Sequence, residues 1–263
     1  MTAIGIVESL WRYPVKSMRG ERCDAVFIGF PGVYGDRLFA FHSSTARPGL
    51  PYLTAREQRR MLCYQPRFRE REKTLAPPNL AAAEKLAPGA SPLYADPIDL
   101  QVEVETPSGA TLAIDDPRLH ELLREGVEGE PELTLRRSER ALTDCRPISL
   151  ISSQSIQKLG EETAAPLDPR RFRANLYLNL TNAEGFAENR FVGRSLRLGS
   201  KVTLAILERD PRCMIITLDP ETGEKMPAVL KSVAQKHEGF AGVYAAVLVE
   251  GMVQPGDKVS LLD

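Results

Sequence analysis

Short apolar runs, each ended by a turn signal, dominate this 263-residue chain. In the first half they cover residues 4–10, 23–30, 38–42, 100–105 and 111–114. In the second half they cover residues 175–180, 196–198, 202–207, 213–218, 243–249 and 258–262. Runs of this length between proline and glycine turns are typical of strands in all-β domains. They predict a closed or nearly closed barrel, a fold that leaves no open sheet edges.

Helical patterns are few and brief. Leu119, Leu122 and Leu123 follow two aspartates that can cap a helix, and further short helices are expected around Ile156 and Leu159, after a cap at Ser152 or Ser153, and at 227–235. Residues 75–97 contain several prolines and predict a long surface excursion. The fold class expected is therefore mainly β (α+β), with a few short helices.

The composition narrows the possible functions. The 34 Lys and Arg residues balance 35 Asp and Glu residues, so the chain lacks the basic excess of a general nucleic-acid binder. Its four cysteines are widely spaced, which argues against a zinc knuckle or a disulfide framework and favours a reducing compartment. No apolar run approaches the ~18 residues of a membrane span, and no secretory leader is evident. We expect a cytoplasmic protein that binds neither nucleic acid nor membrane.

The charge is unevenly distributed along the chain. Residues 1–75 carry 13 basic and 7 acidic side chains, a net of +6, whereas residues 76–135 carry 3 and 12, a net of −9. The basic segment could attract a phosphate-bearing ligand. Two oppositely charged solvated faces would explain the same pattern.

Cys213 is the most notable single position, because it follows Asp210-Pro211-Arg212 where one predicted strand ends and the next begins. An adjacent guanidinium favours the thiolate, which is a soft metal ligand and a nucleophile. The simpler interpretation is a small buried residue at the start of a strand.

Two further stretches could hold an oxyanion. Residues 13–20 place Lys16 and Ser17 on a glycine-ended loop, which suits a phosphate but could equally be an ordinary polar turn. Residues 170–175 place Arg173 and Asn175 where arginine can grip an oxyanion and asparagine can bind a heterocycle, or they form an exposed strand. Arginines also follow at Gly35-Asp36-Arg37, where the two charges could pair on the surface, and at Thr54-Ala55-Arg56.

Six such stretches occur in an ordered series that resembles the MOSC family. They are Tyr-Pro-Val-Lys-Ser at 13–17, Gly-Asp-Arg at 35–37, Thr-Ala-Arg at 54–56, Arg-Phe-Arg-Ala-Asn at 171–175, Arg-Cys at 212–213 and Gly-Val-Tyr at 242–244. The chain is most similar to the two-part members, which include the mitochondrial amidoxime-reducing component and its bacterial relatives. That resemblance implies a smaller N-terminal β-barrel-like domain at 1–125, a MOSC β-barrel at 126–263, and a cofactor cleft between them to which the opening strands contribute.

The resemblance also implies a molybdenum cofactor (Mo-molybdopterin) with Cys213 as the metal ligand. Residues at matching positions would contact the cofactor: Lys16, Ser17, Arg37, Ser152, Arg173, Asn175, Arg212 and Tyr244. Asp210 or a bound water would supply protons. Pyridoxal phosphate is not expected, because the aminotransferase-like part of cofactor sulfurases is missing.

The implied function is reduction of a small N-hydroxylated compound, such as an amidoxime or a hydroxylamine-type base. No ferredoxin-type CxxxxCxxC run follows, so the electrons are expected from a separate protein of ferredoxin, flavodoxin or cytochrome b5 type. The alternative is a protein that carries the cofactor, or a sulfur on Cys213, without turnover.

Overall fold

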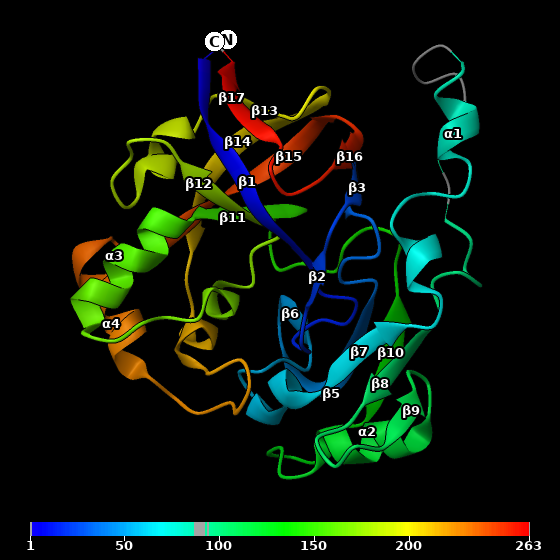
Figure 1. The fold of residues 1–263 in the computed structure, drawn as a ribbon. Helices are drawn as coiled ribbons and strands as arrows, with labels where there is room; N and C mark the ends of the chain where they lie inside the picture. The colour runs from blue at the N-terminus through cyan, green and yellow to red at the C-terminus, as the bar shows by residue number, and fades with distance from the viewer. Residues whose placement is uncertain (1, 87–92, 94, 263) are drawn as a thin grey trace.

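Seven strands close into a barrel in the computed structural model, which describes residues 2–86, 93 and 95–262 (Figure 1). Around the ring the order is β12-β11-β15-β14-β13-β17-β1, and pairing of β1 with β12 closes it. The barrel strands are β1 (Thr2–Arg12), β11 (Ile148–Ser152), β12 (Leu176–Leu180), β13 (Ser195–Leu198), β14 (Val202–Pro211), β15 (Phe240–Val249) and β17 (Lys258–Leu262). The mainly β fold class and the barrel are thus confirmed.

Aliphatic side chains fill the interior of the barrel. Val7, Leu10, Leu178, Leu204 and Val243 are among its fully buried members. Because successive residues of a strand point to opposite faces, each strand contributes alternate residues to this core. The termini lie side by side at one end of the barrel, as Figure 1 shows.

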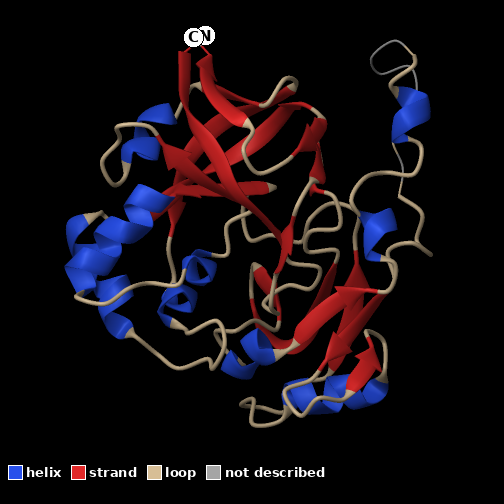
Figure 2. Cartoon of the chain, viewed as in Figure 1, coloured by secondary structure: helices blue, strands red, loops and turns tan. Residues whose placement is uncertain are grey.

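Two helices cover one side of the barrel, α3 (Ser153–Thr163) and α4 (Pro227–Lys236) (Figure 2). Ile156 and Leu159 of α3 pack with Val229 and Val233 of α4, and Tyr177 of β12 joins the same cluster. The helices predicted around Ile156 and Leu159 and at 227–235 are confirmed, and Ser152 is the N-cap of α3, one of the two caps predicted. Burial of this apolar stripe provides most of the stability of such short helices.

A second core lies between small sheets at the other end of the molecule. Phe41, Met61, Val104 and Leu119 are buried in it. One sheet around this core has the order β10-β5-β6 and another β7-β8-β9. A third sheet, β16-β3-β4, contributes Val26, Ile28 and Val253 to the barrel core instead, and β2 pairs with β1. Their bounds are β2 (Glu21–Cys23), β3 (Val26–Gly29), β4 (Gly32–Val33), β5 (Phe39–Arg47), β6 (Leu50–Tyr52), β7 (Gln65–Phe68), β8 (Val102–Glu105), β9 (Thr111–Ala113), β10 (Leu133–Arg137) and β16 (Gly251–Val253).

Short helices connect the strands of the small sheets and of the barrel. They are α1 (Leu80–Ala83), α2 (Pro117–Arg124), and the 3-10 turns η1 (Arg59–Cys63), η2 (Arg71–Thr74), η3 (Pro169–Phe172), η4 (Ala187–Phe191) and η5 (Met214–Thr217). The helix predicted from Leu119, Leu122 and Leu123 corresponds to α2, with Asp116 as its N-cap. Residues 87–92 and 94 of the predicted excursion lie outside the described residues.

The two cores exchange strands across residue 125, where the sequence predicts a domain boundary. β1 pairs with β12 and β17 of the barrel, and β10 pairs with β5 of the other sheet system. The opening strand β1 therefore belongs to the barrel. After β15 the chain leaves the barrel once, where β16 pairs with β3, and then completes the barrel with β17. The boundary at 125/126 stays a prediction.

The strand predicted at 213–218 is wrong. Met214–Thr217 form η5 instead, where the Thr217 hydroxyl donates to the Met214 carbonyl at 2.7 Å and Ile216 packs with α4. A short apolar run fits a buried strand and a buried turn equally well, so periodicity could not separate them. Cys213 precedes this turn rather than starting a strand.

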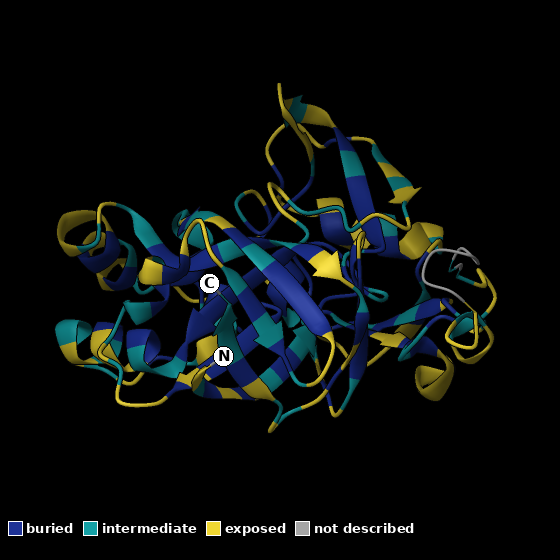
Figure 3. Cartoon of the chain, turned by 90° about the horizontal axis from the view of Figure 1, so that it is seen from above, coloured by how far each residue is buried: buried dark blue, intermediate teal, exposed yellow. Residues whose placement is uncertain are grey.

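Buried positions concentrate in the barrel strands and around the second core, while exposed positions lie on loops, on helices and on the outer faces of strands (Figure 3). Among the described residues, no helix combines the length and apolar character needed to cross a membrane.

Candidate active site

Lys16 lies on the turn after β1, and the fold fixes that turn from both sides. Lys16 N donates to the Phe39 carbonyl at 2.8 Å, and Phe39 N donates to the Pro14 carbonyl at 3.1 Å. The ammonium then reaches the segment before β11, where Nζ lies 2.6 Å from Asp144 Oδ1 and donates to the Leu142 carbonyl at 2.8 Å. Burial lowers the pKa of Lys16 although Asp144 opposes the shift.

Asp144 also binds Arg56, which contacts Cys213. Arg56 Nη2 donates to Asp144 Oδ2 at 2.8 Å and to Cys213 Sγ at 3.4 Å. Burial alone would raise the pKa of Asp144, but the charges and hydrogen bonds of Lys16 and Arg56 outweigh it and lower that pKa to about 2. Lys16, Asp144 and Arg56, from three distant segments, thus form a chain of contacts that ends at the partly buried Cys213 sulfur.

Two arginines stack on one tyrosine beside this group. The guanidinium carbons of Arg37 and Arg173 lie 4.5 Å and 4.4 Å from the centroid of the Tyr13 ring. Arg37 pairs with Asp36 at 2.6 Å, and its Nη2 donates to the Arg173 carbonyl at 2.8 Å. Asp36 is 3% exposed, so the pair is buried rather than on the surface as the simpler sequence interpretation has it.

Arg173 differs from the other cations of this group in that no described carboxylate pairs with it, although Arg212 Nη2 likewise makes no hydrogen bond among the described residues. Its Nη1 donates to the Met18 carbonyl at 2.8 Å, but its buried Nη2 has no hydrogen-bond partner among the described residues. Burial lowers the pKa of Arg173 to about 10. A buried guanidinium with an unused donor is costly unless an anion binds to it.

Three predicted site residues have left-handed backbone conformations. The φ angles are 66° at Ser17, 44° at Arg37 and 51° at Arg173. For residues other than glycine this conformation costs on the order of 1 kcal/mol each. Such strain is concentrated at functional sites, which is consistent with a ligand-binding role for these loops.

Arg212 and Asp210 form a buried pair at the end of β14. Arg212 Nη2 lies 2.8 Å from Asp210 Oδ2, and the Ser149 hydroxyl donates to the same oxygen at 2.8 Å. Gly242 has φ +80°, and a Cβ there would lie 2.7 Å from the Leu150 carbonyl and 3.1 Å from Arg212 Nη2. Glycine at 242 therefore leaves room for the guanidinium.

Burial raises the pKa of Asp210 and the pKa of Tyr244, and Arg37 is close enough to lower the pKa of Asp210. Arg56 contacts Cys213, and Arg212 precedes it in the chain. Arg37 lies close enough to affect the pKa of both Lys16 and Asp210, and it shares the Tyr13 ring with Arg173. Several cations thus gather near the Cys213 thiol.

Residues 137–260 match the MOSC domain family. No curated protein matches the chain. The MOSC-matching region contains the barrel strands from β11 to β17 together with Cys213, while Lys16, Arg37 and Arg56 come from the preceding part of the chain.

A comparison with solved structures gave several matches. YiiM from Geobacillus stearothermophilus has 21% identity and a TM-score of 0.36, with 45% of this chain and 55% of that chain covered. YiiM from Escherichia coli has 15% identity and a TM-score of 0.33, with 45% and 55% covered. The YUAD protein of Bacillus subtilis has 12% identity and a TM-score of 0.46, with 97% and 93% covered. This chain thus spans about half the length of the YiiM proteins it matches.

Two predicted residues of the MOSC-matching region make hydrogen bonds inside the fold. Asn175 Oδ1 accepts from Ser149 N at 3.2 Å and Asn175 Nδ2 donates to the Trp11 carbonyl at 3.3 Å, so its amide links three barrel segments. Ser152 caps α3 and donates to buried Glu188 at 2.7 Å. Cofactor contact by either residue stays a prediction.

Asp144 was not predicted from the sequence. It stands alone between Thr143 and Cys145, and its partners lie 128 and 88 residues away along the chain. No local pattern marks it, and only the fold shows that it joins the cations near Cys213.

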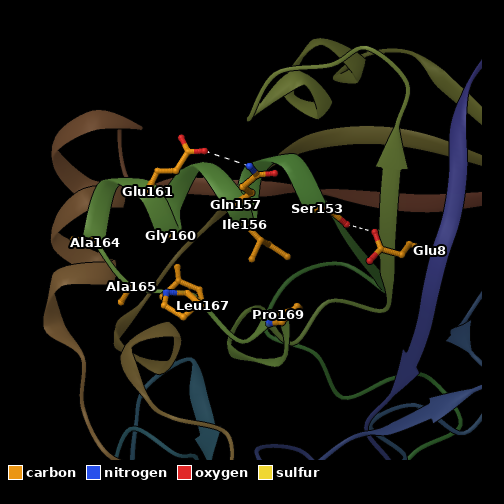
Figure 4. Close-up of a pocket in the computed structure, with 11 residues that line it drawn as sticks. Glu8, Ser153, Ile156, Gln157, Gly160, Glu161, Ala164, Ala165, Leu167 and Pro169 are labelled. Carbon is orange, nitrogen blue, oxygen red and sulfur yellow. Dashed lines mark hydrogen bonds between the residues drawn. The ribbon is translucent and has the colours of Figure 1, made fainter.

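Hollows of about 20 Å³ and 50 Å³ contact Arg173 and Lys16, whereas two larger hollows lie apart from the predicted site residues. One, of about 580 Å³, lies beside α3 and is lined by Ile156, Gly160 and Leu167 among others (Figure 4). A larger cavity of about 950 Å³ lies between the β3–β4 hairpin, α1 and the end of β15. Neither contains a predicted site residue.

Proposed function

We propose that this protein is a molybdenum-cofactor-dependent oxidoreductase that reduces N-hydroxylated compounds. The proposal rests on the MOSC match at 137–260 and on the partly buried Cys213 thiol beside a group of cations. The reaction converts an N–OH group to N–H plus water, and it consumes two electrons and two protons. The electrons would come from a separate redox protein.

The observation that supports this function most directly is the unpartnered Arg173. A phosphate oxygen of the cofactor would accept from Arg173 Nη2, the buried donor that has no partner in the described protein. Arginine is suited to this role because its planar donors match phosphate oxygens. The residues present therefore fit a phosphate-bearing pterin.

Other residues would complete the binding site. Lys16 and Arg37 would add positive charge for the phosphate, and Ser17 would add a donor from its left-handed turn. Arg212 and Tyr244 would contact the pterin. Cys213 would ligate molybdenum through its thiolate, and the bound cofactor would supply the oxygen-accepting redox chemistry that side chains lack.

Asp210 has a position suited to holding a proton, since burial raises the pKa of its carboxyl group. Its contacts with Arg212 and Ser149 keep it beneath the site, 1% exposed. We propose that a proton reaches the substrate from Asp210 through water.

The test is reduction of benzamidoxime by protein from a cofactor-competent host, with reduced methyl viologen as the electron donor. We expect benzamidine to form, and we expect Cys213→Ala to lower the rate at least 100-fold while the pterin is still retained. Cys63→Ala is the matched control and should keep the rate. A cofactor-loaded protein that never reduces benzamidoxime would support the carrier alternative instead.

A further inference from the structure

One nitrogen of Arg56 is shared between a carboxylate and the candidate metal ligand. Arg56 Nη2 donates to Asp144 Oδ2 at 2.8 Å and to Cys213 Sγ at 3.4 Å. A terminal guanidinium nitrogen carries two hydrogens, so it can make both bonds at once. The direction of one bond therefore fixes the direction of the other.

The backbone that carries Arg56 is held in place on its own. Thr54 Oγ1 donates to Glu57 Oε2 at 2.6 Å, and Arg56 N donates to Thr54 Oγ1 at 3.2 Å. Ala55 is fully buried against Leu62 and Leu218, and Leu218 directly follows η5. The turn at 54–57 thus packs against the loop of Cys213, and only the long Arg56 side chain still has freedom to move.

Asp144 removes that remaining freedom. Its second oxygen, Oδ1, is 2.6 Å from Lys16 Nζ, which in turn donates to the Leu142 carbonyl at 2.8 Å. The carboxylate is therefore anchored on a buried ammonium and turns its other oxygen to Arg56. Without it, the two cations would repel each other and the guanidinium would be free to turn to solvent.

We propose that Asp144 is a positioning residue, which holds the Arg56 guanidinium against Cys213 Sγ. The inference rests on the proposed function in one respect, that Cys213 is the metal ligand. Hydrogen bonds to a ligating sulfur orient it and tune the metal. Asp144 would thus act on the metal centre through Arg56 without touching it.

The test measures how much positive charge lies near Cys213 Sγ, using the full chain produced without cofactor. Peptide-resolved mass spectrometry follows alkylation of Cys213 by anionic iodoacetate and by neutral iodoacetamide at one pH. The rate with iodoacetate is divided by the rate with iodoacetamide. Both reactions need the thiolate, so this ratio is independent of the thiolate fraction, and it rises with the positive charge near the sulfur. Cys63, half-buried and next to other partners, provides an internal reference.

The decisive result is a double-mutant cycle between positions 56 and 144. In the otherwise unchanged chain, Arg56→Gln should lower the ratio about fivefold, as expected for one charge removed at close range near the surface. In the Asp144→Asn background the same substitution should change the ratio less than about twofold. Asp144→Glu, which keeps the charge, should restore most of the effect.

Asp219→Asn is the matched control, because Asp219 pairs with Arg171 at 3.1 Å. The full fivefold effect of Arg56→Gln should persist in that background. Equal effects of Arg56→Gln with and without Asp144, in variants that unfold as cooperatively as the parent, would overturn the proposal. Loss of the molybdenum function would not, since the measurement uses no cofactor.

Discussion

At the residue scale, the cations of the site differ in whether a carboxylate faces them. Lys16 faces Asp144, Arg37 faces Asp36 and Arg212 faces Asp210. Arg173 has no such partner among the described residues, and its Nη2 has no acceptor. An anion that enters the site would therefore gain most at Arg173, where no internal carboxylate competes.

Replacing Arg173 by methionine tests this difference. Arg173→Met should raise the free energy of unfolding of the cofactor-free protein by about 1 kcal/mol, because it removes an uncompensated buried charge. The same variant should lose at least 90% of its bound pterin. Urea unfolding and pterin fluorescence after oxidation are the measurements.

Arg171→Met is the neighbouring control for that variant. Like Arg173, Arg171 has one buried nitrogen without a partner among the described residues, its Nε, but it pairs with Asp219 and donates to the Thr217 carbonyl at 2.9 Å. Its loss should therefore destabilise the protein and leave pterin binding in place. If Arg173→Met destabilised the protein as much as Arg171→Met, the proposal that Arg173 is a binding site for an anion would be wrong.

Asp144 should make stability depend on pH in acid. Lys16 and Arg56 outweigh burial and hold its pKa at about 2, below the ordinary value of 3.8. The stabilisation is therefore complete above about pH 4 and is lost as the pH falls through about 2. Because the Asp144 side chain is 35% exposed and solvent screens its charge, we expect this contribution to the free energy of unfolding to be about 1 kcal/mol.

The measurement for Asp144 is urea unfolding at steps from pH 5 to pH 2. The stability of Asp144→Asn should fall less steeply with pH than that of the parent, by about 1 kcal/mol over this range. Parallel curves for the two proteins would contradict the ion pairs assigned to Asp144.

At the element scale, the sequence could predict strands and helices where a run is long or clearly periodic. β1, β12, β15 and α4 are examples, because their apolar residues face one core. Residues 213–218 were mistaken for a strand because a six-residue apolar run has no resolvable period. β11 is fully buried, yet it was not predicted.

Ser152 makes the contacts of a helix cap at the start of α3. Its hydroxyl accepts from Ser155 N and donates to Glu188, a carboxylate that is fully buried. Ser152→Ala should lower the free energy of unfolding by about 2 kcal/mol, because it removes the cap and one donor to a buried charge. Thermal or urea unfolding gives the value.

Pterin content decides the role of Ser152. The predicted cofactor contact requires that the folded Ser152→Ala protein lose pterin, as Arg173→Met should, and full retention of pterin would contradict that contact. A stable Ser152→Ala protein without pterin would show that the serine contacts the cofactor.

At the scale of the whole molecule, the site exists only because the two sheet systems exchange strands. Lys16, Arg37 and Arg173 could be singled out from the sequence, because each carries a charge at a strand end or turn. Asp144 could not, since its contacts are 128 and 88 residues away. Long-range pairing of this kind is set by the topology and leaves no local pattern in the sequence.

The exchange of strands predicts that the second half does not fold alone. A fragment of residues 126–263 lacks β1, which pairs with both β12 and β17 to close the barrel. An open barrel exposes strand edges and its apolar interior. We expect no cooperative unfolding transition for this fragment by circular dichroism, whereas the full chain should show one. A cooperative transition in the fragment would support an independent domain at 126–263.

If the cations beside Cys213 hold a molybdenum-bearing pterin, the purified protein should contain both components. Molybdenum and pterin content per chain can be measured by elemental analysis and by fluorescence after purification from a cofactor-competent host. We expect close to one of each per chain, and loss of both in Arg173→Met. A folded parent protein that carries neither molybdenum nor pterin would contradict this expectation.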